Sequence, residues 1–253
     1  DDAMISLVKE AKEAVGVSLT KAGFGPGEGI TAEVCAVMDY SDSMEFQGNR
    51  YKSGEVQGAL ERVTAIATQF DDDGEIPVFP FHDRCWHAGD MNLGNYRGWV
   101  DQNITGDMGR TSYSNAFRTV LDYYDIPTAG GGGRLRDRLR GGGGAAPDTV
   151  VRQNPIYVAF FTDGNPNPED RGPAEAAIIN SANQPVFWQF IGLGSGFEFL
   201  ERLDDMDGRV EDNADFFSAA FIKDMSDQEL FSKLLDEFPQ WVKRVRERGW
   251  ITG

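Results

Sequence analysis

The sequence is poor in cysteine and in positive charge, and it has no long apolar run. Two cysteines, Cys35 and Cys85, cannot form a disulfide framework, and we expect both to be buried, reduced thiols. Lys and Arg number 24 against 41 Asp and Glu, a formal net charge of −17. That charge argues against a nucleic-acid binder and against docking on an anionic membrane by charge. No stretch of about 18 apolar residues occurs, so no transmembrane segment is predicted. The chain does not open with a basic and then apolar leader, and a cytoplasmic location is expected.

What is present is enough for a large globular core. The chain has 253 residues, of which 40% are hydrophobic and 11% aromatic, so it needs no disulfide or metal to fold. Residues 130–144 read GGGGRLRDRLRGGGG and carry a net charge of +3. Glycine runs are too costly in backbone entropy for the interior of a helix or strand, which predicts a flexible surface insertion. The alternative is a basic tether for an acidic partner or for the protein's own acidic face.

Apolar runs that suit buried strands alternate with helical patterns along the chain. Strands are expected at 30–38, 76–81, 156–162, 186–192 and 209–216, and helices at 4–15, 53–70, 113–125, 172–182, 197–203 and 226–248. Residues 85–88 are expected to pair with 76–81, where Pro77 and Pro80 suggest an edge strand. This order predicts an α/β fold with a doubly wound, mostly parallel sheet flanked by helices. We divide the chain into an N-terminal helix and linker, 1–29, and a main domain, 30–253.

Polar side chains follow two of the predicted strands. Asp39, Ser41 and Ser43 come directly after the strand at 30–38, and Asp163, within Thr-Asp-Gly, follows the strand at 156–162. Thr111 precedes a predicted helix between them. Each motif alone is typical of a turn or a helix cap. Because ligands of such sheets bind at the carboxyl ends of the strands, the five oxygen donors together predict a site for a hard divalent cation. Mg²⁺ is favoured, with Ca²⁺ or Mn²⁺ as alternatives.

The pattern D-x-S-x-S, then Thr, then T-D-G resembles the metal-ion-dependent adhesion site (MIDAS) of von Willebrand factor A (vWA) domains. The resemblance covers roughly residues 30–248. Longer blocks, among them VMDYSDSM, YKSGEVQGALERV, GRTSY and PVFWQFIG, resemble the intracellular bacterial vWA domains of tellurium-resistance (Ter) stress operons. They are also similar to the A domains of copines. The insertion at 130–144 departs from the family pattern and lies between Thr111 and Asp163, so it removes none of the five matching positions.

The resemblance implies a role for each of the five residues. Ser41, Ser43 and Thr111 would bind the metal through their hydroxyls, and Asp39 and Asp163 would bind it directly or through water. In this family a carboxylate from a partner protein takes the sixth position. The expected partner is therefore another protein that supplies an Asp or Glu, such as another Ter-type protein, in a tellurium-resistance or chemical-stress complex.

The same residues favour a binding module over an enzyme. A hydrolase built on Ser41 or Ser43 would need a base beside it, and the two histidines lie in neither motif. A phosphatase of the aspartyl type would need Asp at position 41. No catalytic residue and no organic cofactor are therefore expected. The alternatives are a copine-like, calcium-responsive membrane or signalling adaptor and a metal-dependent hydrolase.

Several other motifs have structural explanations. His82 and His87 would lie on opposite faces of a strand, so a second metal site around Cys85 is not expected. The sequence GLGSGF at 192–197 predicts a turn into a helix, not a dinucleotide site. The acidic run between 204 and 215 is expected to be a solvated face, with a calcium or partner site as the alternative. Leu234, Phe238 and Trp241 form one helical stripe that is expected to face the core.

Overall fold

The computed structural model describes residues 2–46, 48–71, 73–128 and 148–253. Its centre is a six-stranded sheet in the order β3-β2-β1-β4-β5-β6. The strands are β1 (Glu33–Asp39), β2 (Ile76–Phe81), β3 (Gly89–Met91), β4 (Ile156–Thr162), β5 (Val186–Leu193) and β6 (Ala214–Ala219). Only β3 runs antiparallel, and the other neighbours pair in parallel. The predicted doubly wound, mostly parallel α/β sheet is confirmed.

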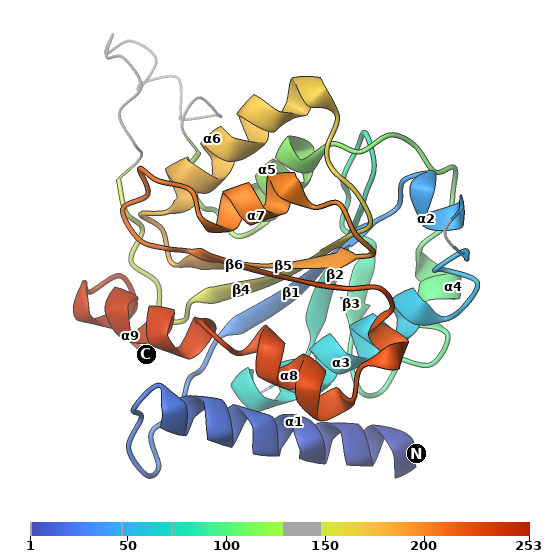
Figure 1. The fold of residues 1–253 in the computed structure, drawn as a ribbon. Coiled ribbons are helices and arrows are strands. Elements are labelled where there is room, and N and C mark those ends of the chain that lie inside the picture. The colour runs from blue at the N-terminus through green and yellow to red at the C-terminus, as the bar shows by residue number, and fades with distance from the viewer. Residues whose placement is uncertain (1, 47, 72, 129–147) are drawn as a thin grey trace, which may run out of the picture.

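Helices cover both faces of this sheet (Figure 1). On one face lie α5 (Tyr113–Tyr123), α6 (Arg171–Ser181) and α7 (Glu198–Asp204). The other face is covered by α1 (Asp2–Lys21), α3 (Glu55–Phe70), α8 (Asp227–Leu234) and α9 (Phe238–Glu247). The short helices are α2 (Ser43–Phe46), α4 (Trp99–Asn103) and two 3₁₀ turns, η1 (Pro168–Asp170) and η2 (Ile222–Asp224). No helix in the described ranges has the length and apolarity that crossing a membrane requires.

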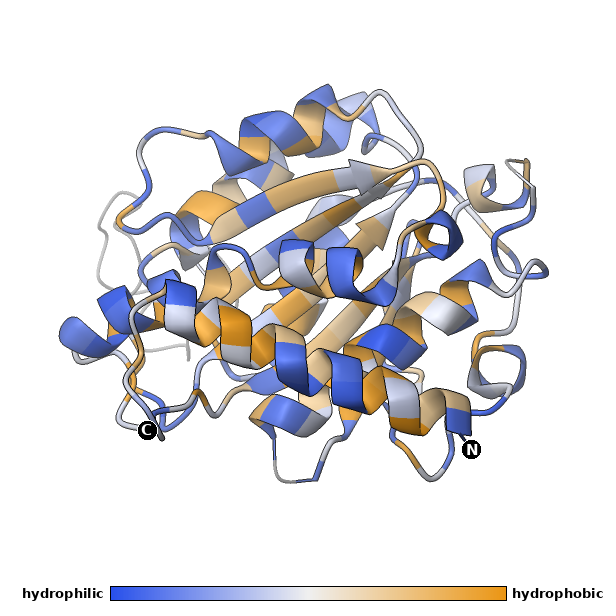
Figure 2. Cartoon of the chain, turned by 60° about the horizontal axis from the view of Figure 1, so that its bottom comes forward, coloured by the Kyte–Doolittle hydropathy of each residue, from blue (hydrophilic) through white to orange (hydrophobic). Residues whose placement is uncertain are grey.

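The core has two layers because the central strands are buried on both sides. Every residue of β4 and β5 is buried. One layer packs against α5, α6 and α7 and includes Phe117, Phe160 and Trp188. The other includes Phe187, Phe238 and Trp241. Figure 2 shows the strands coloured mainly as hydrophobic, whereas the surrounding helices carry mixed colours. The stripe of Leu234, Phe238 and Trp241 is in the core, as predicted.

Of three predictions about the strands, two were wrong and one was confirmed. Pro77 and Pro80 do not mark an edge, because β3 pairs with β2 at 76–78 and makes β3 the edge strand. Segment 85–88 does pair with β2, as predicted: Phe81 bridges to Cys85, and the N–H groups of Trp86 and Ala88 donate to the carbonyls of Pro80 and Val78 at 3.3 and 2.9 Å. The pairing continues as strand β3 at 89–91. Strand β6 begins at Ala214, not at 209.

The helix expected over 226–248 is two helices, α8 and α9. Pro239 lies in the first turn of α9, and a proline there cannot continue a preceding helix, because its ring clashes with the carbonyl four residues back. The N-terminal helix is longer than expected, 2–21 in place of 4–15. Of the two cysteines, Cys35 is buried and Cys85 only half-buried, and both are free.

The insertion predicted at 130–144 lies outside the described residues. The residues that flank it are at the amino ends of the strands. Gln184, two residues before β5, donates to the carbonyl of Asp148 and accepts from the backbone N–H of Val150, at 3.0 and 2.9 Å. The chain that follows the insertion is therefore tied to the end of the sheet opposite to the carboxyl ends of β1 and β4.

Candidate functional site

The candidate site lies where the order of the strands reverses. From β1 the chain continues to β2 and β3 on one side, and β4, β5 and β6 follow on the other, so β1 and β4 flank the switch point. Asp39 is the last residue of β1, and Asp163 directly follows β4. Both are buried, at 0% and 4% exposure. The sheet therefore places the two predicted carboxylates at the position where doubly wound folds bind ligands.

Side-chain hydrogen bonds join these carboxylates to the two serines. The Asp39 carboxylate accepts from the backbone N–H of Ser41 at 2.8 Å. The hydroxyls of Ser41 and Ser43 lie 3.0 Å apart. Ser43 donates to Oδ1 of Asp163 at 2.6 Å, across 120 residues of sequence. Four of the five predicted residues thus form one chain of polar contacts.

Thr111 reaches the site through its backbone. Ser41 forms a parallel bridge with Gly109, and the N–H of Asp42 donates to the Gly109 carbonyl at 2.9 Å. On the other side of the loop, the N–H of Asn167 donates to the Thr111 carbonyl at 3.0 Å. Within the described ranges no side-chain hydrogen bond joins Thr111 to the other four residues. The backbone contacts thus place Thr111 beside the loop of Ser41, and its hydroxyl takes no part in the chain of hydrogen bonds among the other four.

Burial leaves the two carboxylates short of compensating charge. Burial first, and the nearby Asp163 second, raise the pKa of Asp39 to about 6. Burial also raises the pKa of Asp163, while Ser43 and Arg50 act to lower it. Oδ2 of Asp163 is buried and has no hydrogen-bond partner among the described residues. An unpartnered buried carboxylate oxygen beside two hydroxyls and a second carboxylate is the donor set that a hard divalent cation would complete.

The structure adds supporting residues that the sequence analysis missed. Thr162 donates to Oδ2 of Asp39 at 2.6 Å, and the Tyr113 hydroxyl lies 3.1 Å from the Thr162 oxygen. Tyr51 donates to the Asp39 carbonyl at 2.7 Å. Thr162 stands within the motif already singled out, so the sequence held a signal for it. The sequence held no such signal for Tyr51 and Tyr113. Their contacts, to Asp39 and Thr162, span 12 and 49 residues and depend on the fold.

Asp170 holds the loop before α5 against the loop after β4. Its carboxylate accepts from the hydroxyl of Ser112 at 3.2 Å and from the backbone N–H of Ser114 at 3.1 Å. The Ser114 hydroxyl also donates to it. Because Ser112 directly follows Thr111, this buried carboxylate fixes the position of Thr111 relative to Asp163.

The other motifs do not form a second metal site. His87 pairs with Asp90 at 2.8 Å, and Nδ1 of His82 accepts from the N–H of Arg84 at 3.3 Å. In the described part of the chain no three His, Cys, Asp or Glu side chains are grouped so as to hold a metal ion. The 192–197 segment forms a turn into α7, as predicted. A methyl group at Gly192 would come within 2.6 Å of the Phe197 ring, which accounts for that glycine.

The acidic run is not entirely a solvated face, which corrects the prediction. Glu211 is only 9% exposed and accepts from Arg244 at 2.9 Å and from Arg248 at 2.5 Å. Asp212 pairs with Arg209 at 2.7 Å. Part of the run therefore fastens α9 to the segment before β6.

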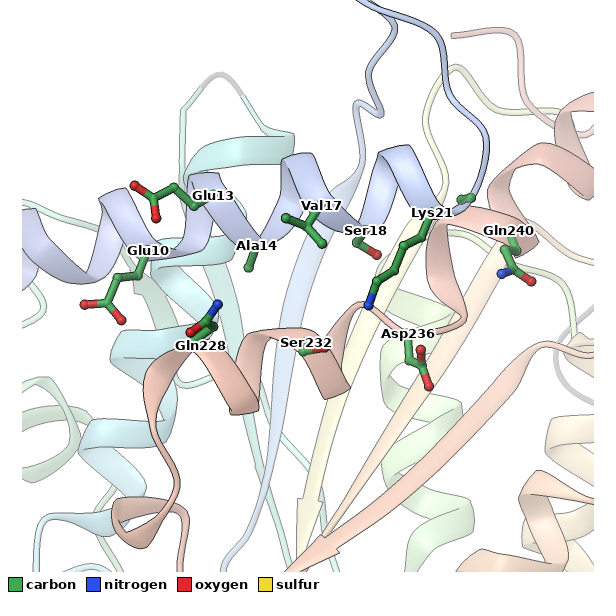
Figure 3. A pocket seen from close by; sticks show the side chains of 11 residues that line it. Glu10, Glu13, Ala14, Val17, Ser18, Lys21, Gln228, Ser232, Asp236 and Gln240 are labelled. Carbon is green, nitrogen blue, oxygen red and sulfur yellow. The ribbon is translucent and has the colours of Figure 1, made fainter.

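A hollow of about 530 Å³ lies away from the site, between α1 and α8 (Figure 3). Glu10, Glu13 and Lys21 line it from α1, and Asp236 and Gln240 border it beyond α8. It contains apolar surface at Ala14 and Val17. No part of the five-residue constellation reaches it.

The fold and the polar constellation at its switch point define a vWA-type domain. Within that class, the chain belongs to the vWA-TerF-like family, described as the vWA found in the TerF C terminus, whose model matches residues 31–130 and 146–251. An uncharacterized protein of Bacillus subtilis (strain 168), YcbR, is 33% identical over 228 residues, which is 88% of this chain and 82% of that protein. The resemblance stated from the sequence motifs is confirmed.

Solved structures support the same fold. A D319A mutant of the PilB minor pilin from Streptococcus sanguinis matches with a TM-score of 0.52 and 14% identity over 86% of this chain. The proximal thread matrix protein 1 from the mussel byssus matches with a TM-score of 0.51 and 15% identity over 84% of this chain. The matches span 64% and 47% of those proteins. At this identity the likeness concerns the fold alone.

Proposed function

We propose that this chain is a metal-dependent protein-binding domain. Ser41, Ser43 and Thr111 hold one Mg²⁺ through their hydroxyls, with Asp39 and Asp163 bound directly or through water. The ion leaves one position for a carboxylate of another protein. The observation that carries the proposal is the buried, unpartnered Oδ2 of Asp163, next to a second carboxylate that lacks a compensating cation. The expected partners are other Ter-type proteins, as the family description suggests.

A binding role fits these residues better than catalysis. The hydrogen bonds of His82 and His87 go to Arg84 and Asp90, and neither ring contacts Ser41 or Ser43 through a hydrogen bond in the described structure. Without a base, a serine hydroxyl is a weak nucleophile. We therefore propose that the domain is not an enzyme and that it acts in a tellurium-resistance or chemical-stress complex.

The proposal is tested by titrating Mg²⁺ into the metal-free protein by calorimetry. The wild type should bind one ion. The Ser41→Ala/Ser43→Ala double variant should lose at least about tenfold in affinity, because two of the hydroxyl ligands are gone. Ser232→Ala, an exposed serine on α8, is the matched control and should bind like the wild type. Equal affinity in the double variant and the wild type would overturn the proposed site. Binding of Ca²⁺ but not Mg²⁺ would instead favour the copine-like alternative.

A further inference from the structure

The mouth of the candidate site carries two side chains that metal binding does not use. Phe46, the last residue of α2, is 82% exposed, more than any other large hydrophobic side chain in the described part of the chain. Arg110 directly precedes Thr111, and its side chain is 64% exposed. Phe46 shares α2 with the proposed ligand Ser43, and Arg110 is the neighbour of the proposed ligand Thr111.

Phe46 is held close to the metal ligands by the short helix α2. The helix begins at Ser43 and ends at Phe46, so the two side chains are one turn apart, with Cβ atoms about 5–6 Å from each other. The intervening Met44 is fully buried in the core. The α2 turn is therefore anchored through Met44, and its packing does not require an aromatic ring at position 46. An aromatic ring exposed at this position is available to a partner.

Arg110 is bound loosely by its side chain and firmly by its backbone. The guanidinium pairs with Glu169 at 3.0 Å, and both side chains are 64% exposed. An ion pair this exposed contributes only about 0–1 kcal/mol, so another carboxylate can replace Glu169 at little cost. The backbone N–H donates to Asp83 at 3.3 Å, and the next residue but one, Ser112, donates to the His82 carbonyl at 3.1 Å. The backbone of this loop is thus fixed, whereas the Arg110 guanidinium is free to exchange Glu169 for another carboxylate.

We infer that the partner presents a short segment in which an Asp or Glu lies within about three residues of an apolar side chain. The inference rests on the proposed function and names the chemistry of its partner. One carboxylate oxygen of the segment binds the metal, and the other accepts from the Arg110 guanidinium, whose planar donors match a carboxylate. The apolar side chain covers the Phe46 ring and removes it from water. Exposed acidic residues around the mouth, Asp42, Glu45 and Asp83, exclude segments with several negative charges.

The experiment is a selection of random peptides displayed on phage against the whole protein, once with excess Mg²⁺ and once in EDTA. The Mg²⁺-dependent peptides should be enriched in Asp or Glu with an aromatic or aliphatic residue close by. A representative peptide is then synthesised and its affinity measured by calorimetry. Phe46→Ser and Arg110→Gln should each weaken it by about fivefold or more, whereas Mg²⁺ binding itself should not change.

Two substitutions serve as matched controls. Leu93→Ser removes an apolar side chain that is 43% exposed and follows β3, at the amino end of β2. Arg118→Gln removes an exposed arginine of α5. Both should leave the affinity for the peptide unchanged.

The outcomes separate the two proposals. Acidic, Mg²⁺-dependent peptides without a neighbouring apolar residue, bound equally by Phe46→Ser, would overturn this inference and leave the metal-bridge function standing. Failure to select any Mg²⁺-dependent peptide would overturn both. Peptides that bind equally in EDTA would show that the chain recognises its partner through another surface.

Discussion

At the scale of single residues, Asp39 links the candidate metal site to the stability of the fold. Its carboxylate is fully buried and lies near Asp163, so ionisation without a metal destabilises the native state. The pKa of Asp39 is raised in the folded protein, from an ordinary value near 4 to about 6. The native state therefore binds this proton more tightly than the unfolded state, and the free energy of unfolding falls as pH rises through that range.

We accordingly predict that Asp39→Asn stabilises the metal-free protein at pH 7 by about 1 kcal/mol, or about 2–4 °C in melting temperature. The amide oxygen still accepts from Ser41, and the Thr162 proton has the Gly164 carbonyl at 3.2 Å as an alternative acceptor. Thermal unfolding in EDTA measures the effect. At pH 4 the difference from wild type should largely disappear, because the Asp39 carboxyl group is then protonated in the native state and uncharged, like the amide. A variant less stable than wild type at pH 7 would show that the hydrogen bonds of Asp39 outweigh its charge.

The sequence was sufficient to predict that four polar residues lie together, but not how their hydrogen bonds connect them. Asp39, Ser41, Ser43 and Asp163 could be proposed because each stands at the end of a recognisable strand, and the structure brings them together. The Thr162 bond to Asp39 spans 123 residues and depends on the pairing of β1 with β4, which a single sequence does not show. Their role as metal ligands remains a prediction.

At the scale of elements, α1 is an addition to the matched vWA model, which begins at residue 31. It packs against the domain through one stripe, Met4, Leu7, Ala11 and Val15, spaced at three and four residues. Its opposite side remains exposed, with Val17 at 55%. The helix is therefore integrated into the core layer that α3 and α8 also form.

From this packing we predict that Leu7→Ala lowers the free energy of unfolding by about 2–3 kcal/mol, since it leaves a cavity beneath a helix. Val17→Ala, on the exposed side of the same helix, should change it by no more than about 0.5 kcal/mol. Urea unfolding followed by circular dichroism gives both values. Equal effects of the two substitutions would mean that α1 does not share the cooperative core.

The boundary between α8 and α9 shows why element ends are harder to predict than elements. Both helices bury an apolar face in the same core layer, so the 3.6-residue pattern continues across the break. Only Pro239 marked it, and a proline indicates a start or a kink as readily as an end. The same reasoning applies to β6, where Val210 extended the apolar pattern ahead of the strand although its own side chain is 51% exposed.

At the scale of the whole molecule, excess negative charge gathers at the edge of the sheet formed by β6. Burial raises the pKa of Asp204 to about 7 and that of Glu237 to about 7, and it also raises the pKa of Asp215. Neighbouring carboxylates raise both pKa values further. Those of Asp215, Glu237, Asp212 and Asp205 act on Asp204, and those of Asp215, Asp212 and Asp236 act on Glu237, where Arg244 opposes them. These groups hold protons more tightly in the folded state than in the unfolded chain.

The sign of the pH dependence follows from this. Acidic groups with a raised pKa destabilise the fold once they ionise, so stability should be lost as pH rises through 7. We predict a lower melting temperature at pH 8 than at pH 6, measured in EDTA at constant ionic strength, since salt screens such repulsion. The double variant Asp204→Asn/Glu237→Gln should reduce this difference and be more stable than wild type at pH 8.

Glu247→Gln provides the control, because it removes an exposed charge at the end of α9. It should leave the pH 6 to pH 8 difference unchanged. A double variant whose melting temperature falls between pH 6 and pH 8 as steeply as that of the wild type would refute the assignment to this edge.

The ties of Gln184 to Asp148 and Val150 have a practical consequence for following the protein in solution. They anchor the residues after the insertion at the amino ends of the strands, whereas Asp39 and Asp163 stand at the carboxyl ends. A fluorophore or affinity tag attached at Asp148 would thus lie on the side of the sheet away from the candidate metal site. Partner binding should then be observable with a reporter inside the chain, with both termini and the site's own loops left unmodified.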